Sequence, residues 1–118
     1  MFFNSQKPIR VAEIISNSQI VLNIGIVDGA SKGDEYIIYE ISDNDIIDPN
    51  TGGSLGRLEI YKGIGQIIYL QDTMCILQAI DNSPLAFFNS RLATKSPDIK
   101  FSSPKVGDYA KPNAAKVQ

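Results

Sequence analysis

The stretch Asp45–Ile60, DIIDPNTGGSLGRLEI, is the segment around which the fold of this chain is expected to be organised. Two apolar runs flank a turn that contains a proline, an asparagine, a threonine and two neighbouring glycines. Proline pre-sets φ near the start of a turn, and glycine accepts the positive φ that turns often need. The stretch therefore predicts a β-corner or hairpin that holds a small barrel together, and it carries no obvious catalytic chemistry.

The cleanest alternation of apolar and polar residues follows this corner, in the sequence GRLEIY. Because side chains along a strand point alternately to its two faces, Leu58 and Ile60 are expected to face inward and Arg57, Glu59 and Tyr61 outward. Two isolated glycines then interrupt the pattern in KGIG. Such glycines usually mark a bulge or a sharp bend, so one long, bent strand is predicted here.

The remaining strand signals are short, apolar and separated by glycine-rich or polar turns. In the first 80 residues no segment shows the 3.6-residue period of an amphipathic helix. The pattern predicts an all-β fold, a small antiparallel barrel of about six strands. Besides the long strand, the expected strands cover Ile9–Ile15, Gln19–Ile24, Glu35–Ile41, Met74–Ile80 and part of Val106–Ala110.

A short sequence echo links two turns far apart in the chain. Gly33-Asp34 and Gly107-Asp108 each precede a segment that looks like a strand. Glycine permits a positive φ, and aspartate accepts hydrogen bonds from nearby backbone N–H groups. The same turn chemistry is therefore expected at both places.

Length and composition describe one ordinary globular domain. The chain has 118 residues, of which 43% are hydrophobic and 20% charged, close to the averages for soluble domains. Its formal charge is −2 and its pI about 4.9. With no basic surplus to neutralise phosphates, nucleic acid is not an expected partner.

The N-terminal sequence and the single cysteine favour the cytoplasm. No cationic start followed by a long apolar run is visible, so no signal peptide is predicted. No apolar stretch approaches the ~20 residues needed to span a bilayer. Cys75 stands alone, which precludes an internal disulfide and agrees with a reducing compartment.

The character of the sequence changes after residue 80. We divide the chain into a β-barrel domain over residues 1–80, an extended arm over 81–111 and a disordered tail over 112–118. The arm is rich in proline and serine, yet it contains Leu85, Phe87 and Phe88. These residues are too apolar for a free linker, so the extended arm is expected to dock on the barrel or on a neighbouring subunit.

The best candidate for a metal site is Asp48 with Asn50 and Glu59. Counted from Asp48, these residues match three ligand positions of a calcium loop. However, Gly52 stands where another side-chain oxygen is needed, and neither flank is helical. The competing interpretation is a β-turn, and this interpretation is favoured: no metal or cofactor is expected.

An enzyme is not predicted either. The chain has no histidine, which removes the usual general base. Cys75 lies in a predicted strand, where cysteine normally behaves as a small apolar residue.

The tyrosines allow two interpretations. Aromatic side chains on a small barrel can grip peptides or other ligands, or they can pack in a core or subunit interface. The strongly apolar strands EYIIYEI and GQIIYL favour subunit contact in a domain of this size. The candidate interface residues are Tyr36, Tyr39, Tyr61, Tyr69, Leu85, Phe87 and Phe88.

Several motifs resemble the C-terminal domain of flagellar assembly protein T and related small uncharacterised bacterial proteins. The similarity covers roughly residues 9–80. It includes a Gly-Asp turn, an Asp-Pro-x-Thr-Gly corner and the strand that follows. The turn residues that match are Gly29, Ala30, Gly33, Asp34, Ile47, Asp48, Pro49, Thr51, Gly52, Leu55 and Gly56, and the strand residues are Leu58 and Ile60.

The resemblance implies an SH3-like β-barrel without catalytic residues. The chain departs from the flagellar protein because it shows neither that protein's other domains nor an export signal. The expected function is therefore a non-enzymatic, cytoplasmic assembly or interaction module that forms homo-oligomers or binds another protein. The alternative is a barrel that binds a peptide or small ligand through a tyrosine-rich face.

Overall fold

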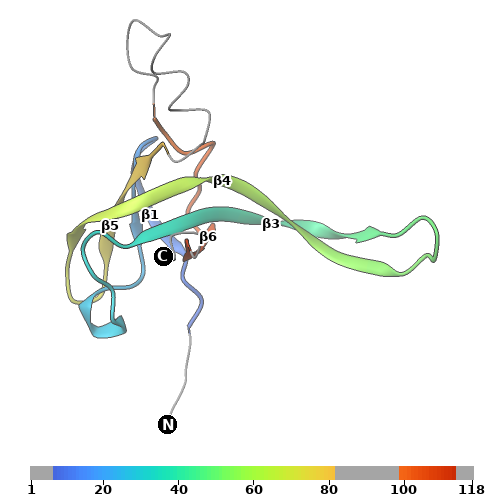
Figure 1. Ribbon diagram of the computed structural model, residues 1–118, viewed down its shortest axis with the longest axis horizontal. Helices are drawn as coiled ribbons and strands as arrows, with labels where there is room; N and C mark the ends of the chain where they lie inside the picture. Colours follow the sequence, from blue (N-terminus) through green and yellow to red (C-terminus); the bar gives the residue numbers. More distant parts are fainter. Residues whose placement is uncertain (1–6, 82–98, 114–118) are drawn as a thin grey trace, which may run out of the picture.

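The computed structural model of the chain describes residues 7–81 and 99–113, which form one antiparallel sheet (Figure 1). The predicted all-β class is confirmed. A short 3-10 helix, η1 (Ile26–Asp28), follows the second strand. The six strands are β1 (Val11–Ser16), β2 (Gln19–Leu22), β3 (Glu35–Ile47), β4 (Ser54–Leu70), β5 (Cys75–Ile80) and β6 (Tyr109–Pro112).

The sheet is strongly curled, but it is not a closed barrel. Its strand order is β1-β2-β5-β4-β3-β6, so β1 and β6 are its edges. These edges meet at one end, where Val11 N–H donates to the Asp108 carbonyl at 2.8 Å and Ala110 N–H donates to the Ile9 carbonyl at 2.9 Å. These contacts hold residues 9–11 against residues 108–110.

Phe101 fills the centre of the core, although it lies outside the expected barrel domain. Only 2% of its surface is exposed. Its ring lies over Gly63 and Gly65 of β4, where an added Cβ would come within 3.0 Å and 2.9 Å of ring atoms. These two glycines therefore leave the space that the ring occupies. The other large, fully buried side chains are Val11, Ile20, Leu22, Ile38, Ile67, Cys75 and Leu77.

Residues 99–113 are anchored to the same body. The Phe101 N–H donates to the Asn17 carbonyl and the Ser102 N–H to the Lys62 carbonyl, both at 2.8 Å. The last strand, β6, pairs with β3 from Tyr36 to Tyr39, which confirms the predicted strand near Val106–Ala110. The body thus combines residues on both sides of the 82–98 segment.

The Gly-Asp turns have the same geometry, as the sequence echo predicted. Gly33 and Gly107 adopt φ of 97° and 98°. Asp34 accepts the Ser31 N–H at 2.9 Å, and Asp108 accepts the Lys105 N–H at 2.8 Å, each through its side chain. The other predicted turn glycines, Gly29, Gly52 and Gly56, also have positive φ.

The predicted irregularity in the long strand is a β-bulge at Lys62. Ile38 opposes Gly63 and Tyr39 opposes Tyr61, so Lys62 is the extra residue on β4. Lys62 is buried, with 5% of its surface exposed. The bulge therefore marks the place where the β3–β4 hairpin leaves the body.

Candidate interaction site

The distal half of the β3–β4 hairpin projects from the body as a two-stranded ribbon (Figure 1). We call residues 42–60 the hairpin arm. On one side, β6 pairs with β3 only up to Tyr39, and on the other side β5 pairs with β4 only from Ile64 onward. Within the part of the chain that the structure describes, the hairpin arm consequently has no third strand beside it.

The prediction that Leu58 and Ile60 point into a core is wrong. They are 54% and 41% exposed. The alternation identified the face correctly: Ile60 pairs with Glu40, and Glu40 lies two residues beyond the buried Ile38. Leu58 and Ile60 thus continue the inner face of the sheet, but the hairpin arm extends that face past the end of the body.

Ile46 extends this apolar face toward the tip. It pairs with Gly56, which lies two residues before Leu58, so it shares a face with Leu58 and Ile60. Ile46 is 43% exposed. We call Ile46, Leu58 and Ile60 the apolar face of the hairpin arm. Leu55 and Ile47, close to the tip, are also exposed.

The opposite face of the hairpin arm carries two ion pairs. Asp45 pairs with Arg57 across the two strands, with their charged atoms 3.7 Å apart. Glu59 forms an ion pair of 2.7 Å with Lys111 on β6. The hairpin arm therefore presents charged pairs on one face and the exposed side chains of Ile46, Leu58 and Ile60 on the other.

The tip of the hairpin arm is a hydrogen-bonded turn. The Asp48 carboxylate accepts the Asn50 N–H at 2.8 Å, and the Thr51 hydroxyl accepts the Gly53 N–H at 3.1 Å. The Asp48 carbonyl also accepts the Gly52 N–H. These hydrogen bonds close a turn around Pro49, so the predicted corner is the turn of a β-hairpin.

Two residues of the calcium-like spacing have other partners in the structure. Glu59 is bound to Lys111 of β6, whereas Asp48 is bound to its own turn. Among residues 7–81 and 99–113, no group of three or more acidic or cysteine side chains is arranged to hold a metal ion.

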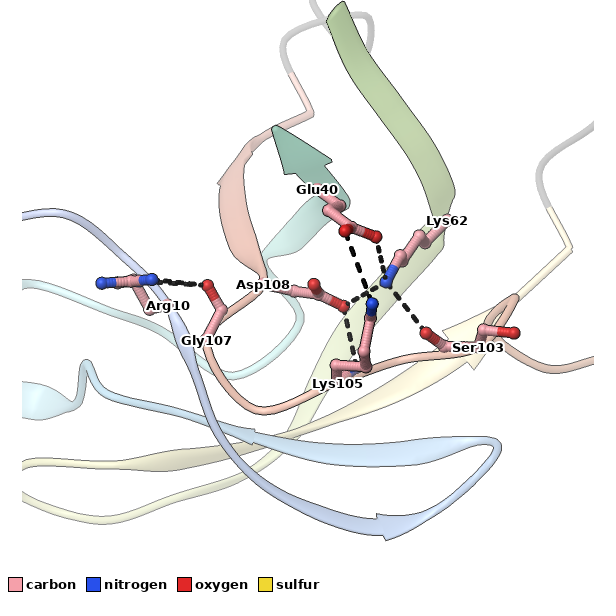
Figure 2. A network of polar contacts seen from close by, with 7 residues as sticks. All are labelled: Arg10, Glu40, Lys62, Ser103, Lys105, Gly107 and Asp108. Atoms are coloured by element: carbon pink, nitrogen blue, oxygen red, sulfur yellow. Dashed lines mark hydrogen bonds and ion pairs between the residues drawn. The ribbon is translucent and has the colours of Figure 1, made fainter. Parts of the chain in front are cut away.

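A buried polar network fixes the base of the hairpin arm (Figure 2). The Lys62 ammonium lies 2.8 Å from Asp108 and 3.1 Å from Glu40, and it donates to the Ser103 carbonyl at 2.9 Å. Lys105 lies 3.4 Å from Glu40. The network joins β3, β4 and the segment that precedes β6.

Charge pairing in this network shifts two pKa values. Hydrogen bonding and attraction from Lys62 lower the pKa of Glu40, and Lys105 adds to this effect. Burial opposes the charged form of Lys62, but its bonds to Asp108 and Glu40 outweigh burial and raise its pKa. Both shifts favour the charged forms of Glu40 and Lys62, in keeping with a structural role for their ion pair.

An open polar depression of about 380 Å³ lies next to this network. The Arg10 guanidinium borders it, donates to the Gly107 carbonyl and stacks 4.5 Å above the Tyr109 ring. Arg57 and Lys105 also line it, together with Glu40 and Asp43. Both charge signs are thus mixed along its walls.

The four candidate tyrosines do not form one face. Tyr36 is buried and borders a second open depression of about 430 Å³. Tyr39 pairs with Tyr61 across the hairpin and stacks on Tyr109 with ring centroids 5.7 Å apart. Tyr69 lies near the other end of β4, opposite Ile76. Leu85, Phe87 and Phe88, the other candidate interface residues, lie outside the described residues.

Cys75 behaves as the strand pattern predicted. It is buried and unpaired, and burial raises the pKa of its thiol to about 11. At neutral pH the thiol is therefore protonated and shielded, unlike a catalytic nucleophile.

No protein-family model matches the chain, and no curated protein matches it. In the described residues no helix is both long and apolar enough to cross a membrane. What the structure defines is thus an all-β domain with a projecting hairpin.

Proposed function

We propose that this chain is a non-enzymatic assembly or interaction module that self-associates. The observation that carries the proposal is the hairpin arm: its apolar face is formed by Ile46, Leu58 and Ile60, all more than two-fifths exposed. Isolated two-stranded ribbons are only marginally stable in water. A subunit that covers the hairpin arm would stabilise it and remove apolar surface from water.

The SH3-like class and the cytoplasmic setting belong to this proposal. The meeting of β1 and β6 supports a barrel-like arrangement, because Val11 and Asp108 join the sheet edges at one end. The buried, unpaired Cys75 suits a reducing compartment.

The alternative, a ligand-binding domain with a tyrosine-rich face, has weaker support. Tyr36 is buried, and Tyr69 is far along β4 from Tyr39 and Tyr61. A binding face would need these rings to line one hollow. Neither of the two depressions described above is lined by Tyr39, Tyr61 or Tyr69.

The double substitution Leu58→Ser with Ile60→Ser tests the proposal. Because both side chains are exposed in the single chain, the fold should survive their replacement while self-association weakens about tenfold or more. The dissociation constant can be measured by sedimentation velocity over a range of protein concentrations.

Val27→Ser is the matched control. Val27 is even more exposed, but it lies on η1, outside the hairpin arm. We expect this variant to associate like the wild type. Equal association of all three proteins would show that the hairpin arm is not the contact surface.

A further inference from the structure

The outer edge of β4 is available along the hairpin arm. In the described residues β5 covers β4 only from Ile64 to Leu70, while β3 occupies the other edge of β4. Unpaired strand edges are templates for pairing with another chain. A specific partner strand requires an edge whose backbone groups point outward, whose residues follow one another without a bulge, and whose charges match its own.

One hydrogen bond shows which backbone groups point to that edge. The Leu58 N–H donates to the Ser42 hydroxyl on β3 at 3.2 Å. Because successive residues of a strand direct their N–H and C=O groups to opposite sides, the corresponding groups of Arg57 and Glu59 point away from β3. These groups form the pairing edge.

The β4 edge carries no inserted residue from Gly56 to Tyr61, between the extra residue Leu55 and the bulge at Lys62, whereas the β3 edge of the hairpin arm is protected. On β3, the pairing with β4 is irregular between Ile41 and Asp45. The carboxylates of Asp43 and Asp45 lie on this irregular part of the strand. Bulges and charges are devices that block edge pairing. On β4, by contrast, the residues from Glu59 to Tyr61 pair without interruption.

We propose that a second copy of this chain pairs antiparallel along the β4 edge, with the two-fold axis at Leu58. Arg57 then lies opposite Glu59 of the partner subunit, and Glu59 opposite the partner subunit's Arg57. The two hairpin arms form a continuous four-stranded sheet. This inference rests on the proposed self-association and places one contact, with its partner and register, at the β4 edge beside the apolar face.

The charge pattern selects this register over its neighbours. If the two-fold axis lies at Glu59 instead, Glu59 faces Glu59 of the partner subunit. If it lies at Arg57, Arg57 faces the partner subunit's Arg57. Opposite charges across a strand pair are favourable, and like charges are unfavourable. Only the register centred on Leu58 gives two attractive pairs.

The apolar face of the hairpin arm is also compatible with this register. Leu58 lies opposite the partner subunit's Leu58, at a position where cross-strand side chains approach closely. Ile60 lies opposite the partner subunit's Gly56, which presents no side chain to oppose it. The pairing joins the apolar faces of the two hairpin arms into one surface, and it is isologous, so it closes as a dimer.

Charge reversal provides the test. Arg57→Glu sets two carboxylates against each other at both cross-strand positions, and Glu59→Arg sets two guanidinium groups against each other there. Each variant alone should therefore dimerise about tenfold more weakly or worse. Mixed in equal amounts, the two variants present opposite charges at both positions. The mixture should recover the dimer, as measured by light scattering after size-exclusion chromatography.

Lys111→Met is the control for the ion pair within the chain. It removes the Lys111 partner of Glu59 but leaves both edge charges in place, so it should dimerise like the wild type. If the wild type associates and the single variants do so equally well, or if the mixture fails to recover a dimer, this register is wrong while the proposed self-association stands. A wild type that is monomeric at every concentration would overturn both.

Discussion

Replacement of Phe101 by alanine should lower the free energy of unfolding by about 3–5 kcal/mol, the usual cost of deleting a buried aromatic ring. The ring is 2% exposed and fits over Gly63 and Gly65. Neither glycine has a side chain that could fill the space, so a cavity should remain. Urea denaturation followed by circular dichroism measures the change.

Tyr69→Ala provides the comparison for this loss. Tyr69 is 53% exposed, so the free energy of unfolding should change by only about 0.5 kcal/mol. If Phe101→Ala were no more destabilising than Tyr69→Ala, residues 99–113 would not belong to the core.

The second large effect is expected for Lys62→Met. Methionine has a similar length but cannot neutralise Asp108, which is 4% exposed and lies 2.8 Å from the ammonium. Leaving a buried charge without its partner should cost about 3 kcal/mol. Adding Asp108→Asn should recover part of this loss, because the remaining side chain is neutral.

The pH dependence reports on the same network. Glu40 contributes stability above its ordinary pKa of 4.5, and this contribution is lost as the pH falls through its lowered value in the folded state. Lys62 contributes below its ordinary pKa of 10.5, and this contribution is lost as the pH rises through its raised folded value. In Lys62→Met the acid loss due to Glu40 should shrink, and the part of the alkaline loss that is due to Lys62 should disappear.

Lys111→Met separates this effect from that of an exposed ion pair. Lys111 bonds to Glu59 at 2.7 Å, but both side chains are close to half exposed. Solvent screens such a pair, so little change in stability is expected. A Lys62→Met variant as stable as Lys111→Met would contradict the structural role of the buried network.

Local patterns predicted most of the strands and turns. Alternation and β-branched residues identified the segments that became β1 to β5, because both signals depend on near neighbours in the sequence. The Gly33-Asp34 and Gly107-Asp108 turns were predictable for the same reason. Each is completed by a hydrogen bond to a residue only three positions away.

Contacts between distant residues were not predictable. The partners Lys62 and Asp108 are 46 positions apart, and nothing near Lys62 in the sequence indicates that it is buried. The prolines and serines around Phe101 indicated an extended arm that docks on the barrel or on a neighbouring subunit, and they did not single out Phe101 as a core residue. Its place in the core depends on space left by glycines of β4.

The hairpin arm shows the limit of alternation most clearly. The pattern GRLEIY correctly placed Leu58 and Ile60 on the face that continues the core. The alternation could not show that no other part of the described body covers this face at Leu58 and Ile60. The stretch Asp45–Ile60 therefore forms the outer part of a projecting hairpin. Two of the three residues of its apolar face, Leu58 and Ile60, were expected to be buried.

The most direct test of self-association is the molar mass of the wild-type chain in solution. Light scattering after size-exclusion chromatography should give a mass that rises with concentration to twice that of the 12.9 kDa chain. A constant mass of one chain at every concentration would contradict the account.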